Sequence, residues 1–419
     1  MRRNILLLVA SLIVSLALFE VGLRLAPPAG IKAKLPDRPS DARVLATDEF
    51  SSRVVTNRRG LRESREFFPD HPGTVRVAAV GDSFTWGWGV DNADTYPAVL
   101  ESLLKTQTGR AVEVVNVGKS GDNLAGYVRL LHHHALPLKP DVVAMEFLVG
   151  NDCPVEWPLR AWPDATVAER IAAHVRDARG RPPTFYLGRL FSMAVAQPVR
   201  EYVRARRDKR DAPLAPDILR RLAASSPARA ERVARLERDG WIAKGRAWTI
   251  SPWLIAHAIE SPEFEPASLF LDDATHPAME AQWRICEGLI EAMRGTVEKA
   301  GARFVLLILP SAVQVDGRAL AFRRALGFPL DERALGPSEA HARLARFCAR
   351  TGTACVDTLD AARAATAEGQ RLFYVQDGHP TKEGYALIAR QAAERLAPTV
   401  AALVAALVAE RAAATAAKR

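Results

Sequence analysis

The stretch that decides the fold reads Val75-Arg76-Val77-Ala78-Ala79-Val80-Gly81-Asp82-Ser83-Phe84-Thr85. Its apolar, largely β-branched first half predicts a buried strand of a parallel sheet, and the run breaks at Gly81. Ligands of α/β proteins bind in the crevice outside the carboxyl ends of such strands. Ser83 is therefore a candidate nucleophile. A serine after a strand equally serves to cap the next helix, so its role depends on partners elsewhere in the chain.

Three later stretches supply such partners. Residues 112–118 and 141–149 predict two further buried strands. The first is followed by Lys119-Ser120-Gly121-Asp122-Asn123, and the second by Gly150-Asn151-Asp152. Near the C-terminus, Asp377-Gly378-His379-Pro380 leads into a helical pattern. We expect these loops to share one crevice, because the carboxyl ends of parallel strands lie at one edge of a sheet.

This ordered set of blocks resembles the SGNH/GDSL hydrolase superfamily over roughly residues 57–398. The resemblance implies a three-layer α/β/α sandwich with a five-stranded parallel sheet. Residues 302–309 and 354–357 provide the two remaining strand patterns. It also implies serine-dependent ester chemistry through an acyl-enzyme on Ser83, with no cofactor and no metal. Related membrane-anchored members often carry an Asn-x-x-Gly-x-Arg segment before the first strand, which Asn57-Arg58-Arg59-Gly60-Leu61-Arg62 matches.

The resemblance assigns His379 as the base and Asp377 as the residue that orients it. Asp377 would hold the imidazole tautomer and stabilise its charged form. The family's commoner spacing is Asp-x-x-His, but Gln376 occupies that acid position here. Alginate O-acetyltransferase-like relatives use the shorter Asp-x-His spacing. If Asp377 cannot reach His379, the site is a Ser–His dyad.

A second pair competes for the same role. Asp273-Ala274-Thr275-His276-Pro277 has the usual spacing and also precedes a helical pattern. It comes before the strand at 302–309, whereas the family places its acid/base loop after the last strand. We therefore favour His379 over His276.

The resemblance implies three groups that bind the oxyanion of the tetrahedral intermediate. They are the backbone N–H of Ser83, the backbone N–H of Gly121 and the side-chain amide of Asn151. Such preorganised donors stabilise charge that develops in the transition state. Gly121 suits this role because a residue without Cβ lets a substrate approach the backbone. Asp82 and Asp152 are interpreted as stabilising their turns.

The ends of the chain predict a membrane anchor, a tether and a tail. Arg2 and Arg3 precede an apolar run to Ala26, which at about 22 residues is long enough to cross a bilayer. A cleaved signal peptide is the alternative, but Pro27-Pro28 is a poor context for cleavage. We expect residues 1–26 to be an anchor, 27–56 a tether, 57–398 the SGNH hydrolase-like domain and 399–419 a helical tail. The protein would then be a single-pass inner (cytoplasmic) membrane protein, with its catalytic domain on the periplasmic side.

Residues of about 153–279 break the strand pattern and predict a helical insertion. Helical patterns cover 167–178, 186–206, 218–238 and 253–260. Six of the eight tryptophans lie in or beside this segment, at positions 157, 162, 241, 248, 253 and 283. Their rings could stack on sugars, although core packing is the more frequent use of tryptophan.

Composition and residue spacing bear on nucleic-acid binding, metal binding and the state of the cysteines. The net charge of +9 comes from 57 basic and 48 acidic residues, without a recognised nucleic-acid module, so no nucleic-acid partner is expected. His132, His133 and His134 point about 100° apart on a helix and cannot converge on one ion. Cys348 and Cys355 fit either a disulfide or two buried free thiols. Cys153 and Cys286 are too far apart in sequence to assign.

The leading functional hypothesis is a serine-dependent esterase that acts on acyl, particularly O-acetyl, esters of envelope or exported glycans. One alternative is an O-acetyltransferase that modifies an exported polysaccharide with a membrane acetyl-donor partner. Another is a non-catalytic envelope binding protein on a hydrolase scaffold.

Overall fold

The computed structural model describes residues 41–153, 167–179, 213–260 and 277–416, together with isolated helical positions between 15 and 21. Most of the expected anchor, the first part of the tether, the expected helix at 186–206 and His276 lie outside the described residues. Within the described part of the chain, no helix is both long and apolar enough to span a bilayer.

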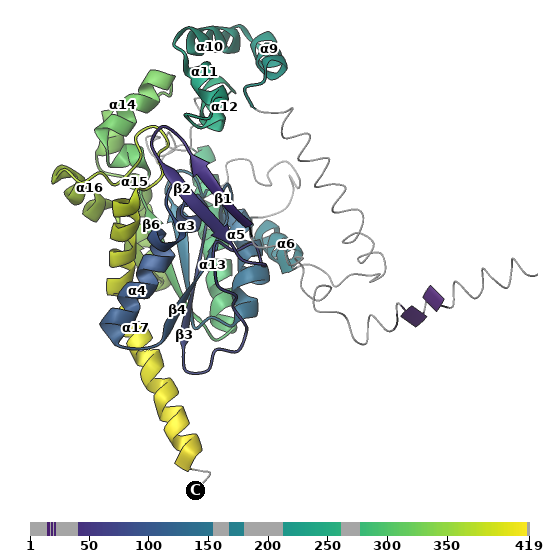
Figure 1. The fold of residues 1–419 in the computed structure, drawn as a ribbon, viewed down its shortest axis with the longest axis vertical. Coiled ribbons are helices and arrows are strands. Elements are labelled where there is room, and N and C mark those ends of the chain that lie inside the picture. Colours follow the sequence, from purple (N-terminus) through teal and green to yellow (C-terminus); the bar gives the residue numbers. More distant parts are fainter. Residues whose placement is uncertain are drawn as a thin grey trace, which may run out of the picture.

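A five-stranded parallel sheet with strand order β4-β3-β5-β6-β7 forms the centre of the fold (Figure 1). The strands are β3 (Val75–Gly81), β4 (Val112–Gly118), β5 (Val142–Leu148), β6 (Arg303–Leu309) and β7 (Ala354–Asp357). Their bounds agree closely with the predicted strands, because β3 to β6 are apolar runs that are largely buried, whereas β7 is a shorter and only partly buried edge strand. The structure confirms the predicted α/β fold with its five-stranded parallel sheet.

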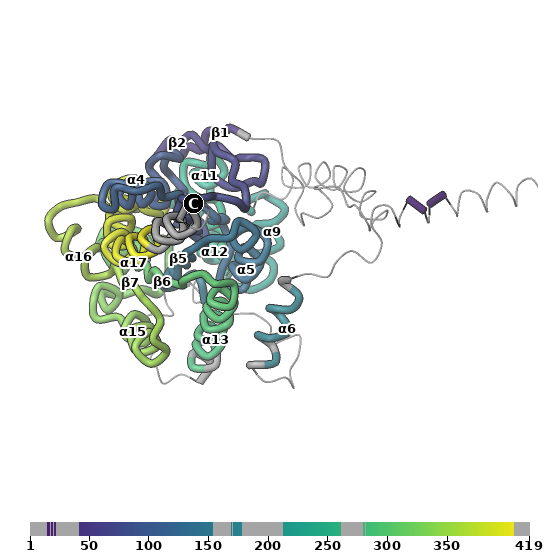
Figure 2. The backbone as a smooth tube through the Cα atoms, turned by 90° about the horizontal axis from the view of Figure 1, so that it is seen from below, coloured from purple at the N-terminus to yellow at the C-terminus, as the bar shows by residue number. Residues whose placement is uncertain are grey.

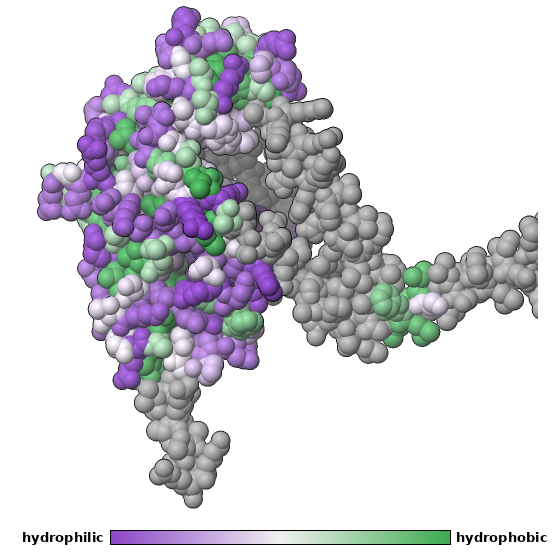
Figure 3. Space-filling model, viewed as in Figure 1, coloured by the Kyte–Doolittle hydropathy of each residue, from purple (hydrophilic) through white to green (hydrophobic). Residues whose placement is uncertain are grey.

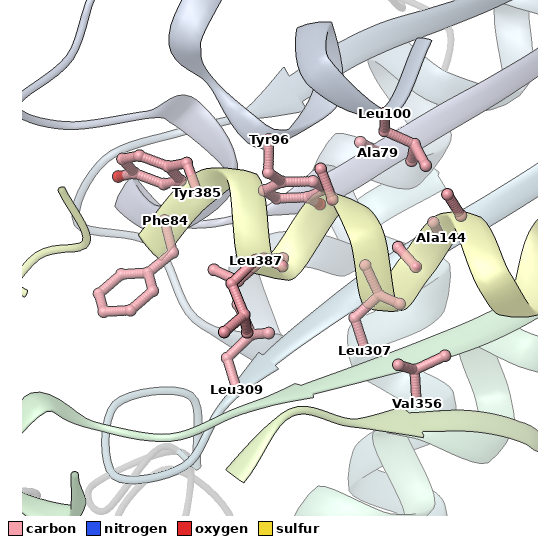
Figure 4. Close-up of a cluster of buried hydrophobic side chains, with 14 of the residues drawn as sticks. Ala79, Phe84, Tyr96, Leu100, Ala144, Leu307, Leu309, Val356, Tyr385 and Leu387 are labelled. Carbon is pink, nitrogen blue, oxygen red and sulfur yellow. The ribbon is translucent and has the colours of Figure 1, made fainter. Parts of the chain in front are cut away.

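Helices cover both faces of the sheet (Figure 2). One face packs against α4 (Tyr96–Thr108), α16 (Leu359–Ala367) and α17 (Lys382–Ala416). Figure 4 shows the buried side chains of this layer, where Tyr96 and Leu100 of α4 and Tyr385 and Leu387 of α17 contact residues of the strands.

The opposite face packs against α5 (Leu124–Leu130), α13 (Pro277–Lys299) and α15 (Glu339–Thr351). This second cluster joins apolar residues of the strands to Tyr127, Leu289 and Phe347 of the three helices. The two clusters complete a three-layer α/β/α sandwich.

Part of the expected tether is folded. β1 (Asp41–Ala46) and β2 (Ser51–Thr56) form an antiparallel hairpin, with Asp41 opposite Thr56 and Ala46 opposite Ser51. Composition rich in Pro, Lys, Asp and Arg suggested an extended linker up to residue 56. Residues 41–56 instead form strands because Val54 and Phe50 are buried against the domain.

The described parts of the insertion are helical, as predicted. They contain α6 (Val167–Arg179), α9 (Pro216–Ser225), α10 (Pro227–Arg238), α11 (Trp241–Arg246) and α12 (Pro252–Glu260). In Figure 1, α9 to α12 lie together beyond one end of the sheet. They share a third hydrophobic cluster with α14 (Gly317–Leu326) and the segment that follows it. We call α9 to α12 the cap.

One predicted cap helix is wrong in extent. Residues 218–238 were predicted as a single helix, but α9 ends at Ser225 and α10 begins at Pro227. Ser226 has extended backbone angles and accepts a hydrogen bond from the Arg229 N–H at its side chain. Proline disfavours helical angles at the preceding residue, so Ser226 becomes the cap of a second helix.

The expected boundary at residue 398 lies inside α17. That helix continues through Pro398, and Val400 and Val404 remain buried in the same cluster as the sheet. Burial of these two valines outweighs the hydrogen bond that a proline removes from a helix. The first turns of the tail therefore belong to the domain.

All four cysteines form disulfides, Cys153 with Cys286 and Cys348 with Cys355. The first joins the loop after β5 to α13, and the second joins the end of α15 to β7.

The described surface seen in Figure 3 is mostly hydrophilic, with apolar residues scattered over it.

Candidate active site

Ser83 is the first residue of a one-turn helix, α3 (Ser83–Trp86), directly after β3. The Asp82 side chain caps this helix by accepting a hydrogen bond from the Phe84 N–H at 2.8 Å. A Cβ at Gly81 would collide with the side chains of Thr85 and Glu146, so the tight strand-to-helix turn requires glycine there. The turn places Ser83 at the carboxyl edge of the sheet.

Ser83, His379 and Asp377 form one chain of hydrogen bonds. His379 Nε2 lies 2.7 Å from Ser83 Oγ, and His379 Nδ1 lies 2.5 Å from Asp377 Oδ1. Asp377 therefore reaches His379 despite the short Asp-x-His spacing, so the hydrogen-bonded group contains all three residues and is not a Ser–His dyad. This is the geometry in which an imidazole accepts the serine proton while a carboxylate holds its tautomer.

A small pinned loop carries Asp377 and His379. An isolated antiparallel bridge pairs Phe373 with Pro380 and closes the loop at its base. The Tyr374 N–H donates to the His379 carbonyl at 2.9 Å. Gly378 has a φ of 87°, a left-handed conformation that glycine adopts at little cost. This turn lets two side chains separated by one residue face each other.

Two residues that the sequence analysis did not identify hold Asp377 in place. Trp88 Nε1 donates to Asp377 Oδ2 at 3.2 Å, and the indole ring lies against the His379 ring at 5.8 Å between centroids. The Glu49 carboxylate, in the β1–β2 turn, accepts from the Asp377 N–H at 2.7 Å and from the Gln376 N–H. The folded hairpin is thus part of the site.

The pKa of Asp377 lies below its usual value. Burial alone would raise it, but the charge of His379 and hydrogen bonds from His379 and Trp88 lower it further than burial raises it. Asp377 is consequently ionised at neutral pH and can stabilise a positively charged imidazole.

The Asn-x-x-Gly-x-Arg segment supports the loop that carries Trp88. The buried Arg62 guanidinium donates to the carbonyls of Gly87 and Val90 and lies 4.5 Å from the Trp86 ring. A buried guanidinium needs hydrogen-bond acceptors. By donating to these two carbonyls, Arg62 fixes the path of the chain after α3.

The expected oxyanion donors lie at the neighbouring strand ends. Gly121, after β4, has a φ of 78°, and no atom lies within 4 Å of where a Cβ would stand. Asn151, after β5, is exposed and donates from Nδ2 to Asp82 Oδ2 at 2.6 Å. Its contact with Asp152 is longer, at 3.4 Å, so the second amide hydrogen can serve a ligand.

Three buried carboxyl groups lie behind Ser83 and Asn151. Glu146 of β5 is fully buried and accepts a hydrogen bond from Thr85 Oγ1. Burial and the charge of Asp82 raise the pKa of Glu146 well above its usual value. Burial also raises the pKa of Asp82. The pKa of Asp152 is raised by burial and by the charge of Asp82. Glu146 therefore holds its proton more tightly than an ordinary carboxyl group does.

Asp152 serves its own loop. It accepts hydrogen bonds from the Leu148 N–H at 2.7 Å and from the Tyr127 hydroxyl at 2.9 Å. Both it and the helix-capping Asp82 stabilise turns, in agreement with the interpretation from sequence.

A cavity of about 590 Å³ opens over Ser83. It is bounded by the catalytic-site loops, by the β1–β2 turn at Thr47 and by cap residues that include Trp248 and Trp253. Arg323 of α14 also lines it, and its Nη1 has no hydrogen-bond partner among the described residues. Among the residues described, no group of three or more His, Cys, Asp or Glu is arranged to hold a metal.

Every predicted site residue that the structure describes lies at this cavity: Ser83, Gly121, Asn151, Asp377 and His379. Glu49, Trp88 and Glu146 were missed. A charged residue within the apolar run of β5 and a Trp in the loop after Ser83 were visible signals for two of them. Nothing local to Glu49 indicates a contact with residues more than 300 positions away.

The comparisons with known proteins concern the family of the chain. The model of the GDSL-like lipase/acylhydrolase family matches residues 79–280, which include Ser83, Gly121 and Asn151. No curated protein matches the sequence.

Similar solved structures include a protein from Desulfitobacterium hafniense DCB-2 that is assigned to the G-D-S-L lipolytic family. Its sequence is 14% identical, the match covers 77% of this chain and 99% of that one, and the TM-score is 0.34. A two-domain esterase active on acetylated mannans is 12% identical, with 78% and 50% covered and a TM-score of 0.36. An acetylxylan esterase variant from Geobacillus stearothermophilus is 12% identical, with 78% and 96% covered and a TM-score of 0.35.

The family match, the order of the sequence blocks and the strand topology lead to one assignment. The chain belongs to the SGNH/GDSL hydrolase superfamily and is an ester hydrolase of that group.

Proposed function

We propose that this enzyme removes acyl groups, O-acetyl groups in particular, from glycans of the cell envelope or from exported glycans. The observation that carries the proposal is the chain of hydrogen bonds from Ser83 through His379 to Asp377 beside Asn151, at the floor of an open cavity. A serine activated in this way attacks an ester carbonyl.

The residues divide the reaction into two halves. In the first half, the proton of Ser83 Oγ passes to His379 Nε2 while the oxygen bonds to the carbonyl carbon. The Asn151 amide and the N–H groups of Ser83 and Gly121 stabilise the negative oxygen. His379 then gives the proton to the sugar oxygen as the ester C–O bond breaks, so that the sugar leaves with a free hydroxyl and the acyl group stays on Ser83. In the second half, water repeats the attack with His379 as base, and the free acid leaves.

The proposed location is the outer face of the cytoplasmic membrane, with residues 1–26 as an uncleaved anchor. Arg2 and Arg3 before the apolar run support this orientation. The pairing of all four cysteines supports it as well, because structural disulfides persist in oxidising compartments outside the cytoplasm. Glycans of the envelope are the ester-bearing polymers within reach of such an enzyme.

An O-acetyltransferase is a second candidate. The Asp377–His379 contact at 2.5 Å supports it, because the short Asp-x-His spacing resembles that of alginate O-acetyltransferase-like proteins. The same acyl-enzyme would then transfer its acetyl group to a sugar hydroxyl instead of water, and a membrane protein would supply the acetyl group. The two candidates differ in the acyl donor and in the acceptor.

The test is covalent labelling of the purified full chain with a fluorophosphonate, mapped by mass spectrometry, beside Ser83→Ala and His379→Ala. We expect a single label on Ser83 that His379→Ala reduces at least about 100-fold in rate. Absence of labelling in the folded wild type would instead favour the non-catalytic binding protein. Release of free acetate from acetylated glycan without an added acceptor would identify the esterase rather than the transferase.

A further inference from the structure

Two tryptophans of the cap are exposed beside the catalytic serine. Trp248 and Trp253 have exposed fractions of 53% and 63%, and both line the cavity that contains Ser83. In the described chain from residue 41 onward, only Val44 and Phe68 are comparably exposed among the large hydrophobic side chains. Exposed apolar surface of this kind marks binding sites when it gathers at one place. Here two of these four exposed residues, Trp248 and Trp253, line one cavity.

The backbone holds Trp248 in an unfavourable conformation. Its φ is 59°, in the left-handed region that bulky residues rarely adopt. The turn is tied from both sides, because the Thr249 N–H donates to the Lys244 carbonyl at 3.1 Å and the Asp48 N–H of the hairpin donates to the Thr249 carbonyl at 3.1 Å. Backbone strain that the surroundings maintain is concentrated at functional sites. Trp248 is thus fixed in position before any ligand binds.

Trp253 is fixed by its helix. It lies in the first turn of α12, whose residues Ile255 and Ile259 are fully buried in the cap cluster. The buried side of α12 anchors the helix, so the indole ring projects from a rigid element. A preorganised ring loses little conformational entropy when it binds a ligand.

The wall beside the tryptophans also carries polar groups, although apolar residues such as Leu254 and Val313 line the cavity as well. Ser251 lies between the two tryptophans in sequence, and Ser311 and Arg323 line the same space. Flat rings beside hydroxyl and guanidinium groups match a sugar, which presents a C–H face to a ring and hydroxyl groups at its edge. An acyl chain would instead need a continuous apolar channel. At about 590 Å³ the cavity is also far larger than an acetyl group requires.

We propose that Trp248 and Trp253 form a stacking platform for sugar rings next to the acylated sugar, so that the enzyme selects an oligosaccharide or polysaccharide chain over small esters and lipids. This rests on the proposed esterase function of Ser83 and adds its substrate class. The platform acts on binding, whereas the catalytic groups act on any ester that reaches Ser83.

The test compares three substrates for each variant of the full chain purified in mild detergent, one of which, p-nitrophenyl octanoate, carries a long acyl chain. The first is p-nitrophenyl acetate, which carries no sugar ring. The second is a panel of O-acetylated saccharides, each as the monosaccharide and as longer oligosaccharides of the same sugar. The variants are Trp248→Ala, Trp253→Ala and Trp253→Tyr. Phe68→Ala is the matched control, because Phe68 is 66% exposed but does not line the cavity.

We expect wild-type kcat/KM to rise with saccharide length for at least one sugar of the panel. Each Trp→Ala change should lower kcat/KM for the longer chains by about 10-fold or more and leave p-nitrophenyl acetate unchanged. Trp253→Tyr should retain most of the activity, because it retains a ring. Unchanged p-nitrophenyl acetate turnover also shows that each variant is folded.

Three outcomes would overturn the platform. They are oligosaccharide activity that the Trp→Ala changes leave unaltered, no gain with saccharide length for any sugar, and loss confined to p-nitrophenyl octanoate, which would indicate an acyl-chain site. Absence of any esterase activity, even on p-nitrophenyl acetate, would instead reject the proposed function itself. The two failures are therefore distinguishable.

Discussion

The Asn151 amide and the Asp82 carboxylate are joined by a 2.6 Å hydrogen bond. Asp82 precedes the proposed nucleophile Ser83 and caps its helix, whereas Asn151, a proposed oxyanion donor, lies in the loop after β5. One carboxylate thus sets the position of Ser83 and of Asn151 at the same time. A shift in either group would move both, which matters because oxyanion stabilisation depends on donors placed before the reaction begins.

Glu146 is expected to act through this pair as a positioning residue. Glu146→Gln keeps an acceptor for Thr85, so we expect kcat within a few-fold of wild type. Glu146→Leu removes the carboxyl acceptor of the buried Thr85 hydroxyl behind Asp82 and Ser83. It should lower kcat about 10- to 100-fold with little change in KM for p-nitrophenyl acetate. Equal kcat values for the Gln and Leu variants would contradict this role.

Asp377 is expected to contribute more than any other group that does not touch the substrate. Asp377→Asn retains the shape but favours the wrong imidazole tautomer, so kcat should fall by about 1,000-fold or more. Trp88→Phe keeps the ring against His379 and removes only the 3.2 Å hydrogen bond to Asp377, so its loss should be about 10-fold or less. Steady-state kinetics with p-nitrophenyl acetate measure both. A larger loss for Trp88→Phe than for Asp377→Asn would contradict the assignment.

The β1–β2 hairpin is expected to support catalysis through Glu49. Glu49→Ala leaves the N–H groups of Gln376 and Asp377 without their acceptor and loosens the loop that carries His379. We expect kcat to fall about 10-fold and fluorophosphonate labelling of Ser83 to slow to the same extent. Glu66→Ala is a suitable control because Glu66 is an exposed carboxylate that accepts only the Arg58 N–H in the described structure. Wild-type kinetics for Glu49→Ala would leave the hairpin without a catalytic contribution.

Local patterns explain what the sequence could predict. The five strands were found because each is an apolar run followed by a polar loop, as in residues 142–152. The Ser83, Gly121, Asn151, Asp377 and His379 set followed from the order of those loops. The break at Ser226 could also be read locally, since Pro227 restricts the residue before it.

The missed features depend on tertiary contacts. β1 and β2 carry no strong strand pattern, and they are stabilised by contacts with residues such as Trp88 and Tyr374 that lie far along the chain. Glu49 gains its role only from that docking. Likewise, Trp248 and Trp253 could not be told apart from core tryptophans, because exposure depends on how α11 and α12 pack.

Glu63 is expected to limit stability at neutral and alkaline pH. Burial raises its pKa to about 7 from an ordinary 4.5, although the Arg65 charge and the Asn116 N–H oppose this. Between these two pKa values the folded state therefore holds a proton that the unfolded state has released. The free-energy cost of ionising Glu63 in the folded state is absent below about pH 4.5 and complete above about pH 7. Glu63→Gln preserves the acceptor for Asn116. It should raise Tm at pH 8 and not at pH 4.5, as thermal unfolding can show; an equal shift at both pH values would exclude ionisation as the cause.

The two disulfides are expected to contribute unequally to stability. Cys153–Cys286 has a sequence separation of 133 residues, and Cys348–Cys355 one of 7. Loop-closure entropy predicts stabilisation of about 5 kcal/mol for the longer loop and about 2 kcal/mol for the shorter one. Cys153 also follows Asn151 by two residues, so its loss should disturb the oxyanion loop. We expect the Cys153→Ser, Cys286→Ser double variant to lower both Tm and kcat, whereas the Cys348→Ser, Cys355→Ser double variant should lower Tm less and leave kcat nearly unchanged. A larger Tm loss for the second variant would show that loop length does not control the contribution of these disulfides.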